Sequence, residues 1–409
     1  MKKIGLVILG IGVLLIGIIS FSKEEKKVLV EEEINNSNTS LVFMLQDKEG
    51  NYNKSEELPS SGYSFNTSKS VCSNNTTPTW EDNKLYLNNL NKNGTSCYLY
   101  FDIFSSAKNT ILSNSKVNEG EPDFSKTATT DEGIYKAEDD WGESYYFRGA
   151  VTNNYVKFAG HYWRIIRING DGSIRVIYNG TDTITVGNSV MIDSSQVFNS
   201  NYNRSEYVGY MYTDGVQHGN TTDSPIKDVI DNWYTTNIAN KGYGDQVSKE
   251  AGFCGDREMA SGYVWSSQPN NIINYAGYGR LNTNKIPTLK CKNNEDMYTA
   301  SESNKGNKKL INPIGLISAD EVSMAGGVIG LPNNNYYLYT GQDYWTMSPY
   351  QFDTSYAYAY VFSIYSSGAL GANPVQATIG VRPVINLVSD VTLSGTGTAS
   401  DPYIVEGAE

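Results

Sequence analysis

Two stretches of the chain carry local signals of a helix, and the first also has the apolar spacing of an amphipathic one. The first runs from Ser224 to about Gly242, where Ser224 suits the capping position and Pro225 the first helical turn. The second follows the apolar run "PIGLI", where Ser318 and Glu321 have the spacing of a capping box and two glycines then stop the helix. The apolar stripe of the first helix consists of Ile226, Val229, Ile230 and Trp233.

Elsewhere apolar and polar residues alternate with the period of a strand, most regularly in "TSYAYAYVFSI" near the carboxyl end. Small residues from Ala357 to Ser363 occupy one face of this strand, and aromatic residues occupy the other. Two orientations are open. Either the small residues pack on a helix and leave the tyrosines accessible, or the tyrosines point into the core. The aromatic face consists of Tyr356, Tyr358, Tyr360, Phe362 and Ile364.

The first residues form an apolar run long enough to cross a membrane. Two lysines precede the uncharged segment Ile4 to Phe21, which as a helix would span about 27 Å, close to a hydrocarbon core of about 30 Å. This length favours an uncleaved, single-pass anchor in the cell membrane with the bulk of the chain extracellular. Ser20-Phe21-Ser22 also has the small-x-small pattern of a cleavage site, which would make the protein secreted. A buried helix is the third interpretation.

Changes in amino-acid composition along the chain predict its domain organisation. Residues 23–40 are rich in charge, the next sixty alternate as short strands, and a polar stretch then separates them from a Tyr- and Gly-rich region. We expect a membrane anchor or signal segment at 1–22, a charged stalk at 23–40, a disulfide-bonded β module at 41–104, a linker at 105–130, a large domain at 131–390 and a hairpin tail at 391–409.

Four cysteines agree with an exported protein. Cys72 and Cys97 lie in one region, Cys254 and Cys291 in another, and none belongs to a C-x-x-C pair or lies near a metal-ligating histidine. Two local disulfides are the simplest of the three possible pairings, and each would stabilise the fold by about 3–4 kcal/mol on the chain-entropy model. Four buried free thiols are the alternative. We predict no metal site and no cofactor.

Charge narrows the class of partner. The 409 residues include 44 acidic and 32 basic side chains, for a net charge of −12. Binding to nucleic-acid phosphates requires clustered Lys and Arg, so we expect no nucleic-acid partner. The 31 tyrosines argue against a disordered acidic tail. The expected partners are a protein or glycan ligand and, through the N-terminal helix, a membrane.

Five fragments occur in a fixed order: "YYFRGAVTNNYVKFAGHYWRIIRINGDGSIRVIY", "AGFCGDRE", "PIGLISADEVSMAGG", "YWTMSP" and "GVRPVINL". Together they resemble surface and phage-associated proteins of Gram-positive bacteria. The carboxyl-terminal domain of those proteins is similar to the C-type-lectin-like fold, which formylglycine-generating enzymes and the variable proteins of diversity-generating retroelements share. The resemblance covers residues 131–390.

The resemblance implies an α+β fold with two helices around a twisted, mostly antiparallel sheet. The predicted fold class is therefore an α+β C-type-lectin-like domain, preceded by a small all-β sandwich module and an N-terminal transmembrane helix. Formylglycine-generating enzymes use a reactive cysteine pair late in the domain, yet no cysteine follows Cys291. The calcium-dependent sugar-binding motifs of lectins are missing too, so we predict no catalytic residues and no enzyme.

Isolated polar residues have structural explanations. His161 lies among aromatic residues and is expected to pack in the core, whereas His218 belongs to a polar loop and is expected on the surface. Ser224 and Lys227 match the S-x-x-K spacing of penicillin-recognising enzymes, but Ser224 is already explained as a helix cap. Arg382 is expected to hydrogen-bond to neighbouring carbonyl groups.

The Tyr- and Ser-rich stretch from residue 344 to 387 remains as the candidate binding site. Tyr offers a large contact area at a low entropic cost, and Ser, Gly and Asn adapt around it, as in antibody recognition loops. We predict a membrane-anchored extracellular adhesion or ligand-binding protein. The alternatives are a formylglycine-generating-type enzyme with a non-standard site and a non-catalytic structural component of the cell envelope. The candidate ligand-binding residues are Tyr350, Phe352, Tyr356, Tyr358, Tyr360, Tyr365 and Asn373.

Overall fold

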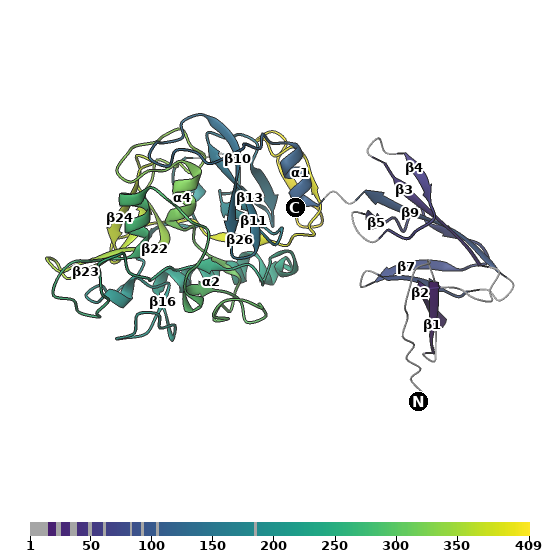
Figure 1. The fold of residues 1–409 in the computed structure, drawn as a ribbon, viewed down its shortest axis with the longest axis horizontal. Coiled ribbons are helices and arrows are strands. Elements are labelled where there is room, and N and C mark those ends of the chain that lie inside the picture. Colours follow the sequence, from purple (N-terminus) through teal and green to yellow (C-terminus); the bar gives the residue numbers. More distant parts are fainter. Residues whose placement is uncertain are drawn as a thin grey trace. The chain divides into compact units, whose positions relative to one another are not determined.

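The chain forms two compact units, Met1–Ser105 and Ser106–Glu409, each with its own core. Figure 1 shows them in a computed structural model. The residues that the structure describes are 15–21, 26–32, 39–47, 51–59, 63–81, 84–90, 94–103, 106–183 and 186–409.

The N-terminal unit contains two β-sheets. One has the strand order β4-β3-β9-β5, with β6 paired to β9, and the other has the order β1-β2-β8-β7. Apolar residues alternate in their strands, so that Phe43, Leu87 and Phe101 are among the side chains buried in one cluster. The strands are β1 (Leu15–Phe21), β2 (Lys26–Glu32), β3 (Thr39–Gln46), β4 (Tyr52–Ser55), β5 (Tyr63–Phe65), β6 (Val71–Cys72), β7 (Thr77–Glu81), β8 (Lys84–Asn88) and β9 (Thr95–Ile103).

The predicted transmembrane helix is wrong for the part of its segment that the structure describes. Leu15–Phe21 forms strand β1, which pairs antiparallel with β2 along its whole length. Its sequence, LIGIISF, is rich in β-branched isoleucine, which favours strands once a partner strand is present. Residues 1–14 lie outside the described part. Among the described residues, no helix has the length and apolar character needed to span a membrane.

The C-terminal unit is built on two larger sheets (Figure 1). The first has nine strands: β21-β26-β14-β13-β12-β28-β27 in order, with β11 paired to β13 and β10 paired to β11. Its core side chains include Trp163 and Ile165 from its central strand, both fully buried. Its strands are β10 (Asp131–Asp139), β11 (Gly142–Gly149), β12 (Tyr155–Phe158), β13 (His161–Ile168), β14 (Ile174–Tyr178), β21 (Ile314–Gly315), β26 (Val384–Leu387), β27 (Leu393–Ser394) and β28 (Tyr403–Val405).

The second sheet has six strands in the order β15-β25-β22-β23-β24, with β19 paired to β22. Two further pairs of short strands, β16-β17 and β18-β20, form separate two-stranded sheets. The strands outside the nine-stranded sheet are β15 (Asp193–Gln196), β16 (Met211–Tyr212), β17 (Thr222–Asp223), β18 (Phe253–Cys254), β19 (Ile273–Asn274), β20 (Met297–Tyr298), β22 (Tyr344–Asp353), β23 (Tyr358–Ile364), β24 (Leu370–Pro374) and β25 (Ile379–Val381).

Helices are few and short. Both predicted helices are present, as α2 and α4, and Ser318 with Glu321 forms the expected capping box. Ser224 precedes α2, but its hydroxyl group donates to the carbonyl of Tyr210 and caps no helical N–H. The described helices are α1 (Ala107–Ser113), α2 (Pro225–Asn237), α3 (Ala276–Tyr278) and α4 (Ala319–Ala325), with a π-helical turn at Gly279–Asn284.

The predicted α+β lectin-like class is corrected by these proportions. The chain as described is mostly β-sheet, with 37% strand against 15% helix. The two predicted helices are present, but the sequence pattern underestimated the amount of strand. Many strands have only two or three residues and acquire their partners from distant parts of the chain.

Candidate functional site

The predicted tyrosine-rich strand lies in the six-stranded sheet, between β22 and β24. Tyr356 is 68% exposed, and Tyr358 and Tyr360 are half-buried. The Tyr358 ring meets the Tyr356 ring at a centroid distance of 6.1 Å and the Tyr202 ring edge-on at 5.2 Å. Tyr202 is itself 41% exposed. We call Tyr202, Tyr356, Tyr358 and Tyr360 the tyrosine face.

A rigid frame supports the tyrosine face. On the opposite side of β23, Ala359 and Val361 are completely buried, so the small residues of this strand point into the core. The Ala359 N–H donates to the Tyr202 carbonyl at 2.8 Å, and this hydrogen bond holds the loop that contains Tyr202 against β23. Beyond Tyr360 both sides of β23 are buried, and Phe362 contacts the ring of Tyr350 at 4.9 Å. The accessible aromatic surface therefore ends near Tyr360.

The other predicted ligand-binding residues do not share this exposure. Phe352 is only 3% exposed, because it pairs between Ile273 and Ala359 in the middle of the sheet. The prediction that Phe352 binds a ligand is therefore wrong, and Phe352 is a core residue. Tyr350 is half-buried, and burial raises the pKa of its phenol to about 12.

Tyr365 and Asn373 form hydrogen bonds within the hairpin. The Tyr365 hydroxyl donates to the carbonyl of Ala372 at 2.8 Å, and the Asn373 amide donates to Ser363 Oγ at 2.9 Å. Both side chains are half-buried. Their polar groups thus stabilise the β23–β24 connection.

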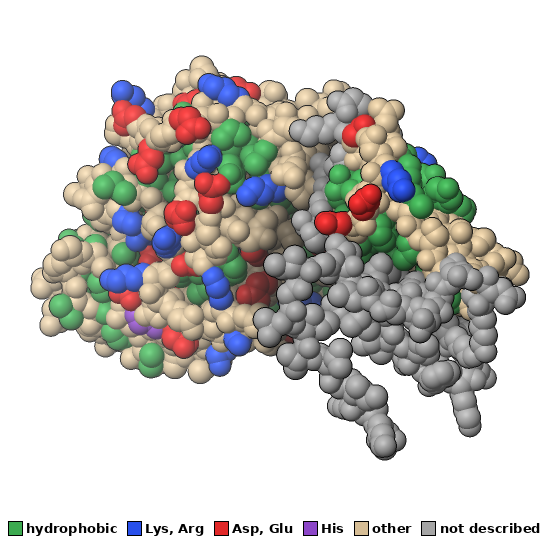
Figure 2. All heavy atoms as spheres, turned by 45° about the vertical axis from the view of Figure 1, so that its right-hand side comes forward, with side chains coloured by type: hydrophobic (Ala, Val, Ile, Leu, Met, Phe, Trp, Pro, Cys, Tyr) green, Lys and Arg blue, Asp and Glu red, His purple; other side chains and the backbone are tan. Residues whose placement is uncertain are grey.

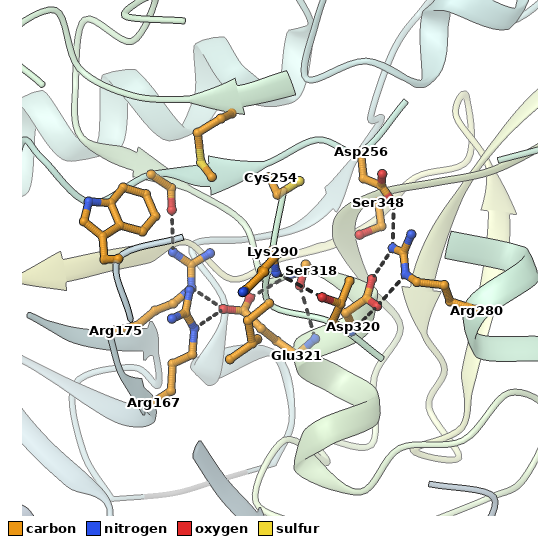
Figure 3. Close-up of a pocket in the computed structure, with 15 residues that line it drawn as sticks. Arg167, Arg175, Cys254, Asp256, Arg280, Lys290, Ser318, Asp320, Glu321 and Ser348 are labelled. Carbon is orange, nitrogen blue, oxygen red and sulfur yellow. Dashed lines mark hydrogen bonds and ion pairs between the residues drawn. The ribbon is translucent and has the colours of Figure 1, made fainter. Parts of the chain in front are cut away.

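A second polar constellation lies inside the C-terminal unit (Figure 3). It comprises three arginines from separate elements, and their side chains converge on carboxylates at the start of α4 and in nearby loops. We call this set the arginine network, and its members are Arg167, Arg175, Arg280, Asp139, Asp256, Asp320 and Glu321.

Glu321 holds the first half of the arginine network together. Its Oε1 lies 3.0 Å from Arg167 Nε on β13 and 2.5 Å from Arg175 Nε on β14. Arg167 Nη1 also contacts Asp139 at 2.6 Å. Burial raises the pKa of Glu321, but the guanidinium groups of Arg175 and Arg167 outweigh it and hold this pKa below its usual value.

The second half of the arginine network centres on Arg280, which lies in the π-helical turn. Its Nη2 is 2.6 Å from Asp256 and 2.8 Å from Asp320. Burial is the main reason why the pKa of Asp256 is raised. The Thr288 N–H also donates to Asp320 at 2.9 Å, so the carboxylates are satisfied from several directions.

The cavity beside the arginine network is very small. Its volume is about 30 Å³, which is room for about two water molecules. Its lining also includes Cys254, Lys290 and Ser348, which Figure 3 labels around the ion pairs. Each guanidinium already has a carboxylate partner. This geometry favours a structural role, in which ion pairs hold strands, α4 and loops together, over a role as a substrate pocket.

Sequence reasoning missed the arginine network, although one signal was present. Arg167 and Arg175 occupy positions in the otherwise apolar strands "YWRIIRI" and "IRVIY", and both are almost fully buried. A buried guanidinium requires a buried acidic partner. That partner, Glu321, follows Arg167 by 154 residues, so no local pattern identified it.

The isolated polar residues mostly have structural roles. His161 packs against the rings of Tyr178 and Trp233, as expected. Arg382 is fully buried and donates to the carbonyl of Tyr178 at 3.0 Å, also as expected. His218 was expected on the surface; its side chain is 22% exposed, and its Nδ1 lies 3.0 Å from the buried Asp296.

The remaining sequence candidates are also accounted for. Lys227 of the S-x-x-K pattern is fully buried and ion-paired at 2.6 Å with Asp231 and at 3.0 Å with Asp223. Among the described residues no group of His, Cys, Asp and Glu side chains has the arrangement of a metal site.

The four cysteines form the two predicted local disulfides. Cys72 joins Cys97 in the N-terminal unit, and Cys254 joins Cys291 beside the arginine network. The prediction of two local pairings is therefore confirmed.

No family model, curated protein or solved structure matches this chain. The resemblance to lectin-like surface proteins stays a prediction from the sequence fragments.

Proposed function

We propose that this protein is an exported ligand-binding protein whose recognition surface is the tyrosine face. The observation that carries the proposal is the 68% exposed Tyr356, which lies in the turn before β23 and contacts the ring of Tyr358. Tyr358 begins β23, whose opposite side is buried at Ala359 and Val361, and it also contacts Tyr202. Exposed aromatic rings on a rigid support lose little conformational entropy on binding, which favours recognition.

The composition of the tyrosine face indicates the class of ligand. Each phenol combines a flat apolar ring with a polar hydroxyl group, so it matches ligands that present apolar faces edged by polar groups. Sugar rings and polypeptide segments both have this character. The net charge of −12 and the mixed distribution of basic and acidic side chains in Figure 2 disfavour a polyanionic ligand.

An extracytoplasmic location is part of the proposal and is supported by the two disulfides. Disulfides form and persist in oxidising compartments and are rare where thiols are kept reduced.

The arginine network is proposed to have a structural role in the C-terminal unit, because its charges are mutually paired and its cavity admits about two waters.

The test is a binding screen with the full chain on glycan and protein arrays, followed by titration of any captured ligand. The double variant Tyr356→Ala/Tyr358→Ala is expected to weaken binding by at least about tenfold, as for central aromatic residues of interfaces. Tyr98→Ala is the matched control, because Tyr98 is 51% exposed but belongs to the N-terminal unit. Unchanged affinity of a folded double variant would contradict the proposal.

A further inference from the structure

Strand β10 is paired along only one edge for part of its length. Its inner edge pairs with β11 throughout. On its outer edge the described chain makes two isolated parallel bridges, Val117 with Ile134 and Leu289 with Asp139. Four residues of β10, 135–138, lie between these bridges. The open edge corresponds to about 17 Å of strand between the bridged residues at about 3.3 Å per residue.

Backbone groups of the open edge point outward. The Ile134 N–H donates to the Lys116 carbonyl at 2.8 Å, and the Ile134 carbonyl accepts from the Asn118 N–H at 2.8 Å. Because backbone groups alternate along a strand, the N–H and C=O of Lys136 face the same way. Lys136 and Glu138 are exposed, and in the described part of the chain the Lys136 backbone groups have no hydrogen-bond partner.

A groove of about 590 Å³ runs beside this open edge. We call it the edge groove. The middle of β10 forms one side of it together with Glu143 and Tyr146 of β11, and the segments 121–125 and 285–290 supply most of the remaining wall. Ile286 is 66% exposed on its wall. Exposed sheet edges are normally covered or charged, because they add strands readily. Its further apolar lining consists of Pro122, Phe124, Pro287, Leu289 and Met324.

The ends of the edge groove differ in charge. Glu121 and Asp123 lie on the segment that follows the bridge to Ile134, whereas Lys285 and Lys290 lie on the segment that bridges to Asp139. Between them, Lys136 and Glu138 line the open edge itself, and Lys136 forms an ion pair with Glu143 of β11 at 3.9 Å. The acidic end is therefore near the start of the open edge and the basic end near its finish. A bound strand parallel to β10 would place its amino end at the acidic side.

We propose that the edge groove is a peptide-binding site. Its occupant is a short extended segment of a partner polypeptide, which adds to β10 as a parallel strand of about three or four residues. The Lys136 backbone groups hydrogen-bond to the added strand, and the apolar walls receive alternate side chains. The charge pattern selects a basic residue at the amino end of the segment and an acidic residue at its carboxyl end. This site is separate from the tyrosine face and does not depend on the function proposed for it.

The test starts from a random library of linear heptapeptides displayed on phage and selected with the full chain. Enriched peptides, synthesised with capped ends, are expected to carry a basic residue before an acidic one. Exchanging the two charges is expected to weaken binding. Methylating single backbone nitrogens of a binder is expected to weaken binding at alternate positions, because only every second N–H of a strand faces its partner.

Variants of β10 separate backbone pairing from side-chain contacts. Lys136→Pro removes one outward N–H, at the kind of edge position where proline is tolerated, and is expected to weaken binding by at least about tenfold. Lys136→Ala keeps the N–H and is expected to bind within about threefold of the wild type. Ile286→Asp, on an exposed wall, is expected to weaken binding even if the proline variant fails to fold.

Three results would overturn the proposal. The first is a selection with the full chain that enriches no peptide. The second is equal binding of the enriched peptides to the wild type and to both weakening variants. The third is a wild-type dimer in sedimentation experiments that Ile286→Asp dissociates, since the edge would then pair with a second copy of the chain.

Discussion

The tyrosine face and the arginine network are both rich in polar side chains, yet they differ in how those groups are satisfied. In the arginine network each guanidinium lies within 3.0 Å of a carboxylate of the same unit. On the tyrosine face the rings contact one another, and Tyr356 remains 68% exposed. The charged groups of the arginine network are thus satisfied within the protein, whereas the rings of the tyrosine face remain accessible to a ligand.

This difference shows where ligand binding is to be sought in the C-terminal unit. Charges that are buried and mutually paired hold elements together and contribute little to ligand binding. A ligand that displaced one partner would leave the other charge buried and unpaired, at a large cost in desolvation free energy. Aromatic groups on a buried frame offer contact area without disturbing the fold. Substitutions in the two regions should therefore separate stability from binding.

The largest expected effect is on stability, from Glu321→Gln. This substitution leaves Arg167 and Arg175 buried without a shared carboxylate, and breaking such a set costs about 3–5 kcal/mol of unfolding free energy. Urea unfolding measures the change, with the exposed Glu406→Gln as control. A loss as small as that of the control would mean that Glu321 does not hold the arginine network together.

A similar but smaller loss is expected without the disulfide beside the arginine network. The double variant Cys254→Ser/Cys291→Ser opens a link between residues 37 positions apart and should destabilise the C-terminal unit by about 2–5 kcal/mol. Hydrogen exchange read by mass spectrometry locates the loss. Cys72→Ser/Cys97→Ser should instead raise exchange in the N-terminal unit, and the reverse distribution would contradict this assignment.

The arginine network also predicts a pH dependence of stability. The pKa of Glu321 is held below its ordinary value of 4.5 in the folded protein. Its ionised form therefore contributes stability that is fully present above pH 4.5 and is lost as the pH falls through the folded pKa. In the wild type, the unfolding free energy should decrease as the pH is lowered from above 4.5 to below it. The decline should be shallower in Glu321→Gln, and equal slopes would argue against this titration.

The smallest effect on stability is expected on the tyrosine face. Tyr356→Ala removes an exposed ring and should change the unfolding free energy by less than about 0.5 kcal/mol. The same variant should weaken binding of any ligand captured in the array screen. A stability loss of several kcal/mol would show that the ring is part of the core, and would remove the contrast between the two regions.

Part of this architecture follows from the sequence alone. Helix α2 was predictable from its apolar periodicity and from Pro225 in its first turn, and α4 from its capping box, because these signals lie within a few residues of one another. The two disulfides were predictable as local pairings, and Arg382 as a residue that donates to nearby carbonyl groups. The tyrosines were identified as candidates from their alternation in one strand, although the pattern left their orientation open.

The tertiary structure decided the rest, because it depends on partners far away in the chain. Leu15–Phe21 has the composition of a membrane helix, yet it pairs as a strand with β2. Phe352 resembles its tyrosine neighbours in sequence but is covered between two strands. The partner of Arg167 lies 154 residues away, and only packing brought them together. Local propensity determines which elements form, whereas long-range burial decides which side chains are left to meet a ligand.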